Sequence, residues 1–251
     1  MLVPLGTCRF CDDRTKLIKA HIVPRAFYPG ANDIRVLSIH SPRTRRALKG
    51  IYDPQILCAQ CDGMFGVYEN YAATLLRPRP RRADLYRGQD GFIVRGFATR
   101  WRAYWVRRPD VRKLQAFGTS LLWRAGTTTR PEMSVTLDAA ILERARRVIQ
   151  GDEASYFAII GMRCDAGELS GFVARPTLFL DEAPAPGVQF YMNGVVLNIF
   201  LSPPSTEPEA SALLLGQRDD WLIGYVPLQG SKYAETINDI CRQIDYRAIT
   251  P

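Results

Sequence analysis

The chain has 251 residues, 47% of them hydrophobic, and a formal net charge of +8. A chain of this size and composition can bury a real core, so we expect a folded protein, and no apolar run approaches the roughly 20 residues of a membrane-spanning helix. No charged, apolar leader precedes Cys8. We therefore expect a cytoplasmic protein with reduced thiols and no membrane partner.

The charge is unevenly distributed along the chain. Residues 1–130 hold 24 Lys and Arg against 9 Asp and Glu, whereas residues 131–251 hold 9 against 16. Arginine supplies most of the positive charge, and its planar guanidinium binds phosphate in a bidentate way. We expect a polyanionic partner for the first half, with a solvated basic surface as the alternative.

Two Cys-x-x-Cys pairs, Cys8 with Cys11 and Cys58 with Cys61, predict a metal site. This spacing lets two thiolates from one turn take neighbouring corners of a tetrahedron around zinc, and two pairs fill all four corners. Closing the 46 residues between the pairs costs about 3.4 kcal/mol, whereas structural zinc contributes about 10–16 kcal/mol. We expect one structural zinc ion, with buried or disulfide-linked cysteines as the alternative.

A histidine lies between the two pairs, in an apolar segment. His21 precedes Ile22 and Val23, and Pro24 ends the segment. An imidazole with a pKa of about 6.5 can take a proton from water at neutral pH, as the general base of a hydrolase does. A hydrogen-bonded core histidine is the alternative interpretation.

Basic residues follow this segment and recur after residue 78. They predict contacts to a phosphate backbone, which should weaken steeply with salt. The expected nucleic-acid-binding residues are Arg25, Arg43, Arg45, Arg46, Lys49, Arg79, Arg81 and Arg82. A helix is predicted over residues 62–76, because apolar side chains recur there at helical spacing and Pro78 ends the pattern.

The order of these motifs over residues 8–76 resembles the HNH endonuclease family: Cys-x-x-Cys, then His-Ile-Val-Pro, then Asp53 five residues before a second Cys-x-x-Cys, then Asp62. The resemblance implies a ββα-metal module braced by the four-cysteine zinc. It implies that His21 is the general base and that Asp53 and Asp62 stand where the family has its central Asn and final His. It also implies a catalytic Mg²⁺, Mn²⁺ or other divalent ion that stabilises charge on the scissile phosphate.

Two functions follow from the resemblance. The first is a metal-dependent endonuclease that hydrolyses DNA phosphodiester bonds, with RNA as an alternative substrate. The second is a nucleic-acid-binding module that has lost catalysis, because Ala20 stands where the family commonly has a metal ligand. Glu69 lies seven residues after Asp62, about 10.5 Å along a helix, and is left out of the expected site. Family association also suggests bacterial defence, with a protein partner or a homo-oligomer.

The remaining residues, 79–251, are expected to form a second domain beside the HNH-like zinc module of residues 1–78. Residues 79–151 are predicted to be basic and helical: Trp101, Tyr104 and Trp105 have the spacing of a core helix face, with base stacking as the alternative. A helix is predicted from Asp138, a capping residue, to Gln150. Strands are predicted over residues 156–162, 171–180, 188–201 and 221–226. The expected class is α+β with a mainly antiparallel β C-terminal region.

Overall fold

A computed structural model describes most of the chain. The described residues are 5–28, 35–37, 45–46, 50–76, 88–92, 101–165, 172–179, 185–204 and 213–227. Within them the structure has three α-helices, one large sheet and two small two-stranded sheets. The predicted α+β class is therefore confirmed.

The large sheet has ten strands, and most neighbouring strands are antiparallel. The strands are β4 (Arg35–Leu37), β5 (Arg45–Arg46), β7 (Gly88–Phe92), β8 (Trp101–Val106), β9 (Ala158–Asp165), β10 (Phe172–Ala174), β11 (Thr177–Phe179), β12 (Gly187–Met192), β13 (Val195–Phe200) and β14 (Trp221–Pro227). Their order is β5-β4-β10-β12-β13-β9-β14-β8-β7, with β11 also paired to β12. Only the β9–β14 and β4–β10 pairs are parallel among these described strands.

The four runs predicted as strands in the last hundred residues all contain strands, but the runs over residues 171–180 and 188–201 each form two. The run predicted over residues 188–201 is a hairpin, because Asn193 and Gly194 both have positive φ, 49° and 81°. An Asn-Gly pair in this conformation is the favoured two-residue turn between antiparallel strands. The turn brings β12 and β13 side by side at the centre of the sheet.

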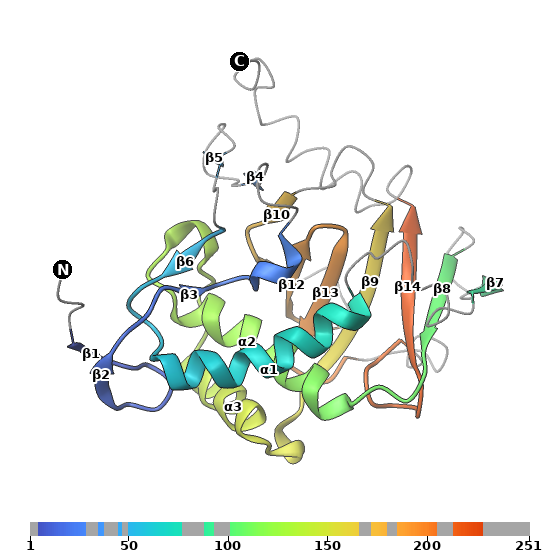
Figure 1. Cartoon of the computed structure of the whole chain (residues 1–251). Helices are drawn as coiled ribbons and strands as arrows, with labels where there is room; N and C mark the ends of the chain where they lie inside the picture. Colours follow the sequence, from blue (N-terminus) through green and yellow to red (C-terminus); the bar gives the residue numbers. More distant parts are fainter. Residues whose placement is uncertain are drawn as a thin grey trace, which may run out of the picture.

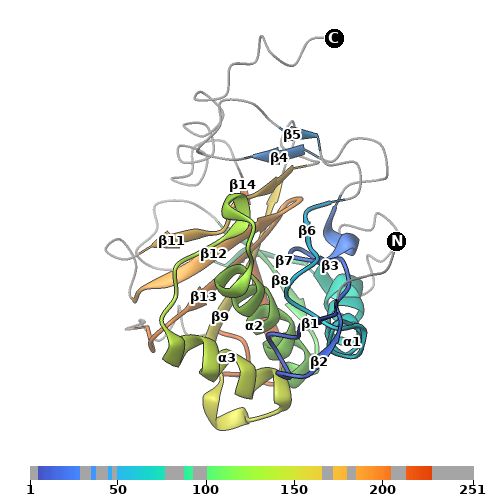
Figure 2. The same cartoon turned by 90° about the vertical axis from the view of Figure 1, so that its left-hand side faces the viewer.

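Three helices cover one face of the large sheet (Figures 1 and 2): α1 (Ala59–Leu76), α2 (Val111–Thr127) and α3 (Ala139–Gln150). The predicted helix that becomes α3 is confirmed, since the Asp138 side chain accepts a hydrogen bond from the Ile141 N–H and Gly151 ends the helix with φ 105°. The middle helix, α2, lies in the region that was predicted to be helical, but its bounds were not predicted. It is buried from Leu114 to Ala125, so this part of the helix has no solvent-exposed face.

The middle helix packs directly on the sheet. A Cβ added at Gly118 would lie 2.8 Å from Cδ1 of Ile159 on β9 and 3.7 Å from Cδ1 of Ile199 on β13, so the glycine allows a close approach. Helices α1 and α3 pack against α2. The helix α2 is therefore the element through which α1 and the sheet share one core.

The N-terminal residues form two short antiparallel pairs beside α1. The first is β1 (Leu5–Thr7) with β2 (Arg14–Lys16), and the second is β3 (Ala20–His21) with β6 (Tyr52–Asp53). A 3-10 turn, η1 (Arg25–Phe27), follows β3. One buried apolar cluster contains residues of this region, of α1 and of the large sheet, so residues 5–76 share their core with the rest of the described chain.

One prediction in the second region is wrong. The residues Trp101, Tyr104 and Trp105, expected on a helix, lie on strand β8, which pairs with β14. Aromatic residues also favour strands, and positions four apart share a face in a strand as well as in a helix. Local spacing therefore did not distinguish the two structures.

Candidate metal centre

The four cysteines of the two pairs lie together. Their Sγ atoms are all within 4.8 Å of one another, and Sγ of Cys11 lies 4.0 Å from Sγ of Cys58. A disulfide needs a sulfur separation of about 2.05 Å, and all four are free thiols. Four sulfurs around a zinc-sized ion at about 2.3 Å would lie about 3.8 Å apart. The cluster therefore has the dimensions of a four-thiolate metal site.

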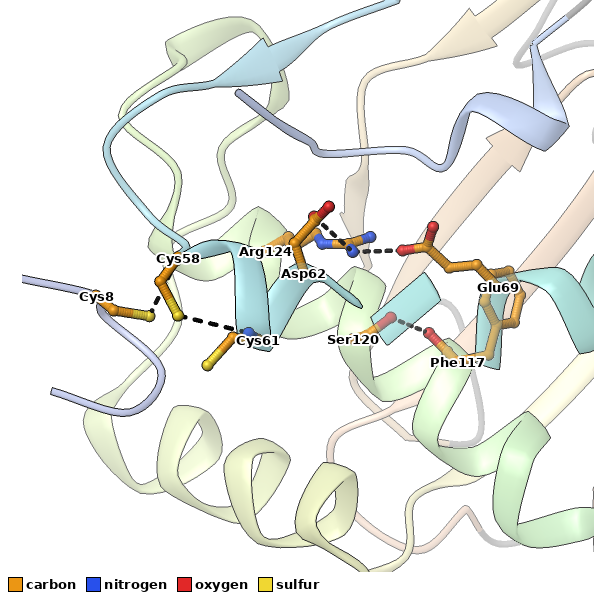
Figure 3. A network of polar contacts seen from close by, with 8 residues as sticks. All are labelled: Cys8, Cys58, Cys61, Asp62, Glu69, Phe117, Ser120 and Arg124. Atoms are coloured by element: carbon orange, nitrogen blue, oxygen red, sulfur yellow. Dashed lines mark hydrogen bonds and ion pairs between the residues drawn. The ribbon is translucent and has the colours of Figure 1, made fainter. Parts of the chain in front are cut away.

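Backbone geometry aims N–H groups at these sulfurs. The turn after Cys8 closes through a hydrogen bond from the Asp12 N–H to the Cys8 carbonyl, with Asp12 at φ 63°. The Cys58 N–H points at Sγ of Cys8 at 3.4 Å, and the Cys61 N–H points at Sγ of Cys58 at 3.5 Å. Figure 3 shows Cys58 and Cys61 at the first turn of α1 and Cys8 facing them. Donors in these positions stabilise thiolates over thiols.

The cysteines differ in their acidity without a metal. Burial opposes ionisation of Cys8, but hydrogen bonds from the backbone at Cys11, Phe10 and Cys58 outweigh it and lower the pKa to about 7. Burial raises the pKa of Cys11 to about 11. Burial and the neighbouring thiols raise the pKa of Cys61 well above its usual range. A divalent ion must therefore displace protons as it binds.

The first Cys-x-x-Cys turn is anchored on all three helices. Phe10, between the first two cysteines, is buried, and its ring centroid lies 5.0 Å from that of Phe65 on α1 and 5.3 Å from that of Trp123 on α2. Arg146 of α3 forms an ion pair with Asp12 at 2.8 Å. The turn that carries the first cysteine pair therefore packs against α1, α2 and α3.

His21, the predicted general base, lies on β3 opposite Tyr52 on β6 and is half-buried. A Cβ added at Gly50 would lie 2.9 Å from the ring of Tyr28 and 3.2 Å from Cδ2 of His21, and Gly50 has φ 80°. The Tyr28 hydroxyl accepts a hydrogen bond from the Ile51 N–H at 3.1 Å. A glycine is thus needed where the chain enters β6 beside the histidine.

Asp53, the second predicted catalytic residue, is completely buried and accepts four hydrogen bonds. Its Oδ1 accepts from the Gln55 N–H at 2.9 Å. Its Oδ2 accepts from the Thr128 hydroxyl, the Thr129 hydroxyl and the Thr129 N–H, at 2.8, 2.8 and 2.6 Å. Burial alone would raise the pKa of Asp53, but these hydrogen bonds lower it. The carboxylate therefore ties β6 to the end of α2.

Asp62, the third predicted catalytic residue, lies near a buried arginine that sequence analysis did not identify. Arg124 of α2 is 1% exposed, and its Nη2 lies 3.9 Å from Oδ1 of Asp62. The same nitrogen forms a close ion pair with Oε1 of Glu69 (Figure 3). The guanidinium also lies 4.8 Å from the ring centroid of Phe65. Arg124 is the only charged residue in the run 114–125, which was the one signal available in the sequence.

The three predicted catalytic residues are not brought together as a metal-binding group. Among the residues the structure describes, the four cysteines are the only set of three or more His, Cys, Asp or Glu side chains close enough to hold an ion. The roles assigned to His21, Asp53 and Asp62 stay predictions.

The predicted phosphate-binding residues are only partly described. Arg25 is exposed on η1, and Arg45 and Arg46 form β5. The other five, Arg43, Lys49, Arg79, Arg81 and Arg82, lie outside the described residues. Further exposed basic side chains on the N-terminal strands and turns are Arg9, Arg14, Lys16 and Lys19.

No protein-family model matches the chain, and searches of curated proteins and of solved structures find no match either. The HNH resemblance therefore stays a prediction from the motifs. None of the helices in the described ranges is long and apolar enough to cross a membrane.

Proposed function

We propose that residues 1–78 are a zinc-braced nucleic-acid-binding module, built on the HNH pattern, in which the four-cysteine cluster has a structural role. The observation that carries the proposal is the convergence of four free thiols within 4.8 Å at the start of α1. Four thiolates favour zinc or an iron–sulfur cluster over hard cations, and the knuckle spacing of both pairs favours zinc. Four protein ligands leave no open position for water or substrate.

The partner is proposed from charge. The first 130 residues carry 24 Lys and Arg against 9 Asp and Glu, and Arg25, Lys16 and Lys19 are exposed near β2 and β3. Contacts of this kind bind phosphates without reading base sequence. DNA is the proposed partner, with RNA as the alternative.

Binding without catalysis is favoured by the surroundings of the two predicted acidic residues. Asp53 uses both carboxylate oxygens to accept hydrogen bonds from the protein. Asp62 lies beside the buried guanidinium of Arg124. A divalent ion at either carboxylate would have to replace these partners.

A second candidate is hydrolysis of DNA with His21 as general base and Mg²⁺ or Mn²⁺ as the catalytic ion. It is favoured by the element order: β3 with His21, then β6, then α1, with the four cysteines at the base of the helix. This order is the one expected of a ββα-metal module.

One experiment separates the two candidates. Zinc-loaded protein is titrated into a labelled DNA duplex at rising salt, and it is incubated with supercoiled plasmid in Mg²⁺ or Mn²⁺. Each assay is repeated with His21→Ala. Salt-sensitive binding without nicking, unchanged in His21→Ala, supports the binding module. Nicking that is lost in a zinc-loaded His21→Ala protein supports the nuclease instead.

A charge variant tests the proposed contact surface. Arg25→Ala should weaken duplex binding and lower its salt dependence. The matched control is Arg218→Ala, which removes another exposed arginine, from the acidic half of the chain. Equal duplex affinities of the two variants would show that Arg25 is not part of the contact surface. Absence of any duplex binding by the parent protein would contradict the proposal.

A further inference from the structure

The buried guanidinium of Arg124 has an unusual set of partners. It is a full positive charge at 1% exposure, and such a charge is costly to bury unless it is neutralised by partners nearby. Both carboxylates that neutralise it come from α1, two turns of helix apart. Figure 3 shows Asp62 and Glu69 approaching the guanidinium from opposite sides.

Both carboxylates approach the same nitrogen atom of Arg124. Oδ1 of Asp62 and Oε1 of Glu69 both approach Nη2 of Arg124, the first at 3.9 Å and the second in a close ion pair. Glu69 was left out of the expected site because helical spacing separates it from Asp62, and the two side chains approach this nitrogen from opposite sides. Oxygen ligands bind Mg²⁺ or Ca²⁺ at about 2.0–2.6 Å. A divalent ion that bridged the two carboxylates would therefore have to lie between their oxygens, where the guanidinium lies.

Apart from the two carboxylates, the guanidinium has a further favourable contact. It stacks near the face of Phe65 at 4.8 Å, which favours a cation. Its Nε and Nη1 atoms have no hydrogen-bond partner in the structure as described. Glu69 is only 17% exposed, compared with 34% for Asp62, so the closer pair is also the better shielded one.

We propose that Arg124 is the resident cation of the Asp62–Glu69 pair and excludes a divalent ion from it. The arginine comes from α2, so a helix outside the proposed module of residues 1–78 supplies the positive charge that a metal ion would otherwise supply at α1. In this role it is a positioning residue that fixes Asp62 near the first turn of α1. The inference holds whether or not the module binds nucleic acid.

The test measures Mn²⁺ binding to zinc-loaded protein by the loss of the free-Mn²⁺ electron paramagnetic resonance signal. The parent protein and Glu69→Gln should have the same Mn²⁺ affinity, because no ion binds at Glu69. Arg124→Met should bind Mn²⁺ about tenfold more tightly than the parent protein. Adding Glu69→Gln to Arg124→Met should abolish this gain in Mn²⁺ affinity. Arg112→Met is the matched control, since it removes an exposed arginine from the same helix.

Two results would overturn the proposal. One is a parent protein whose Mn²⁺ affinity falls in Glu69→Gln, which would place an ion at the pair despite the arginine. The other is a folded, zinc-loaded Arg124→Met that binds Mn²⁺ no better than Arg112→Met. If Arg124→Met does not fold, the comparison of the parent with Glu69→Gln decides: equal affinities support the proposal and a fall overturns it.

Discussion

Replacing Asp53 with asparagine removes one charge and one acceptor from a carboxylate that accepts four hydrogen bonds in a fully buried position. An amide has one oxygen, so it cannot accept from both the Gln55 N–H and the Thr129 N–H. At least one buried donor loses its acceptor, which costs about 1–3 kcal/mol, and the loss of charge weakens the remaining bonds. We expect Asp53→Asn to lower the free energy of unfolding by about 3–5 kcal/mol.

The assay is thermal unfolding of the metal-loaded protein. For a chain of 251 residues, a loss of this size lowers Tm by about 6–9 °C. The matched control is Asp138→Asn, at the N-cap of α3, where asparagine caps as well as aspartate. If Asp53→Asn were no less stable than Asp138→Asn, Asp53 would not be the link between β6 and the end of α2.

Two further predictions concern the same region. The hydrogen bonds lower the pKa of Asp53 below 3.8, so its contribution to stability is present above that pH and is lost as pH falls through the lower, folded-state pKa. Urea titrations should therefore show the stability gap between the parent and Asp53→Asn narrowing below pH 3.8; a gap that widened there would have the wrong sign. Phe10→Ala should cost about 3–5 kcal/mol in the same titration, because the ring packs on Phe65 and Trp123, whereas Phe10→Leu should cost less. Equal and small losses for both would place Phe10 outside the core.

Local signals predicted much of the secondary structure. The helix α3 was predictable because Asp138 and Gly151 mark its ends, and the central strands because β-branched runs are bounded by turn residues. The cysteine cluster was predictable because the two cysteines of each Cys-x-x-Cys pair are close in sequence. Each of these features is encoded within a few neighbouring residues.

The features that sequence analysis missed depend on distant contacts. Residues 114–125 of helix α2 have no solvent-exposed face, because α1, α3 and the sheet pack against this helix. Asp53 accepts three of its four hydrogen bonds from residues 75 and 76 positions later in the chain, and Arg124 pairs with Glu69 across 55 residues. Nothing near these residues in the sequence indicates the pairing, so Asp53 and Asp62 were predicted only from their positions beside the second Cys-x-x-Cys.

The metal content of the purified chain tests the central claim most directly. Elemental analysis with X-ray absorption at the zinc edge should give one zinc per chain, bound by four sulfurs at about 2.3 Å. Cys58→Ser should lose the metal and the cooperative unfolding transition, because Cys58 directly precedes the helix that packs on α2. A fully reduced, folded protein that holds no metal after purification with zinc and without chelators would contradict the account, as would a disulfide between any two of the four cysteines.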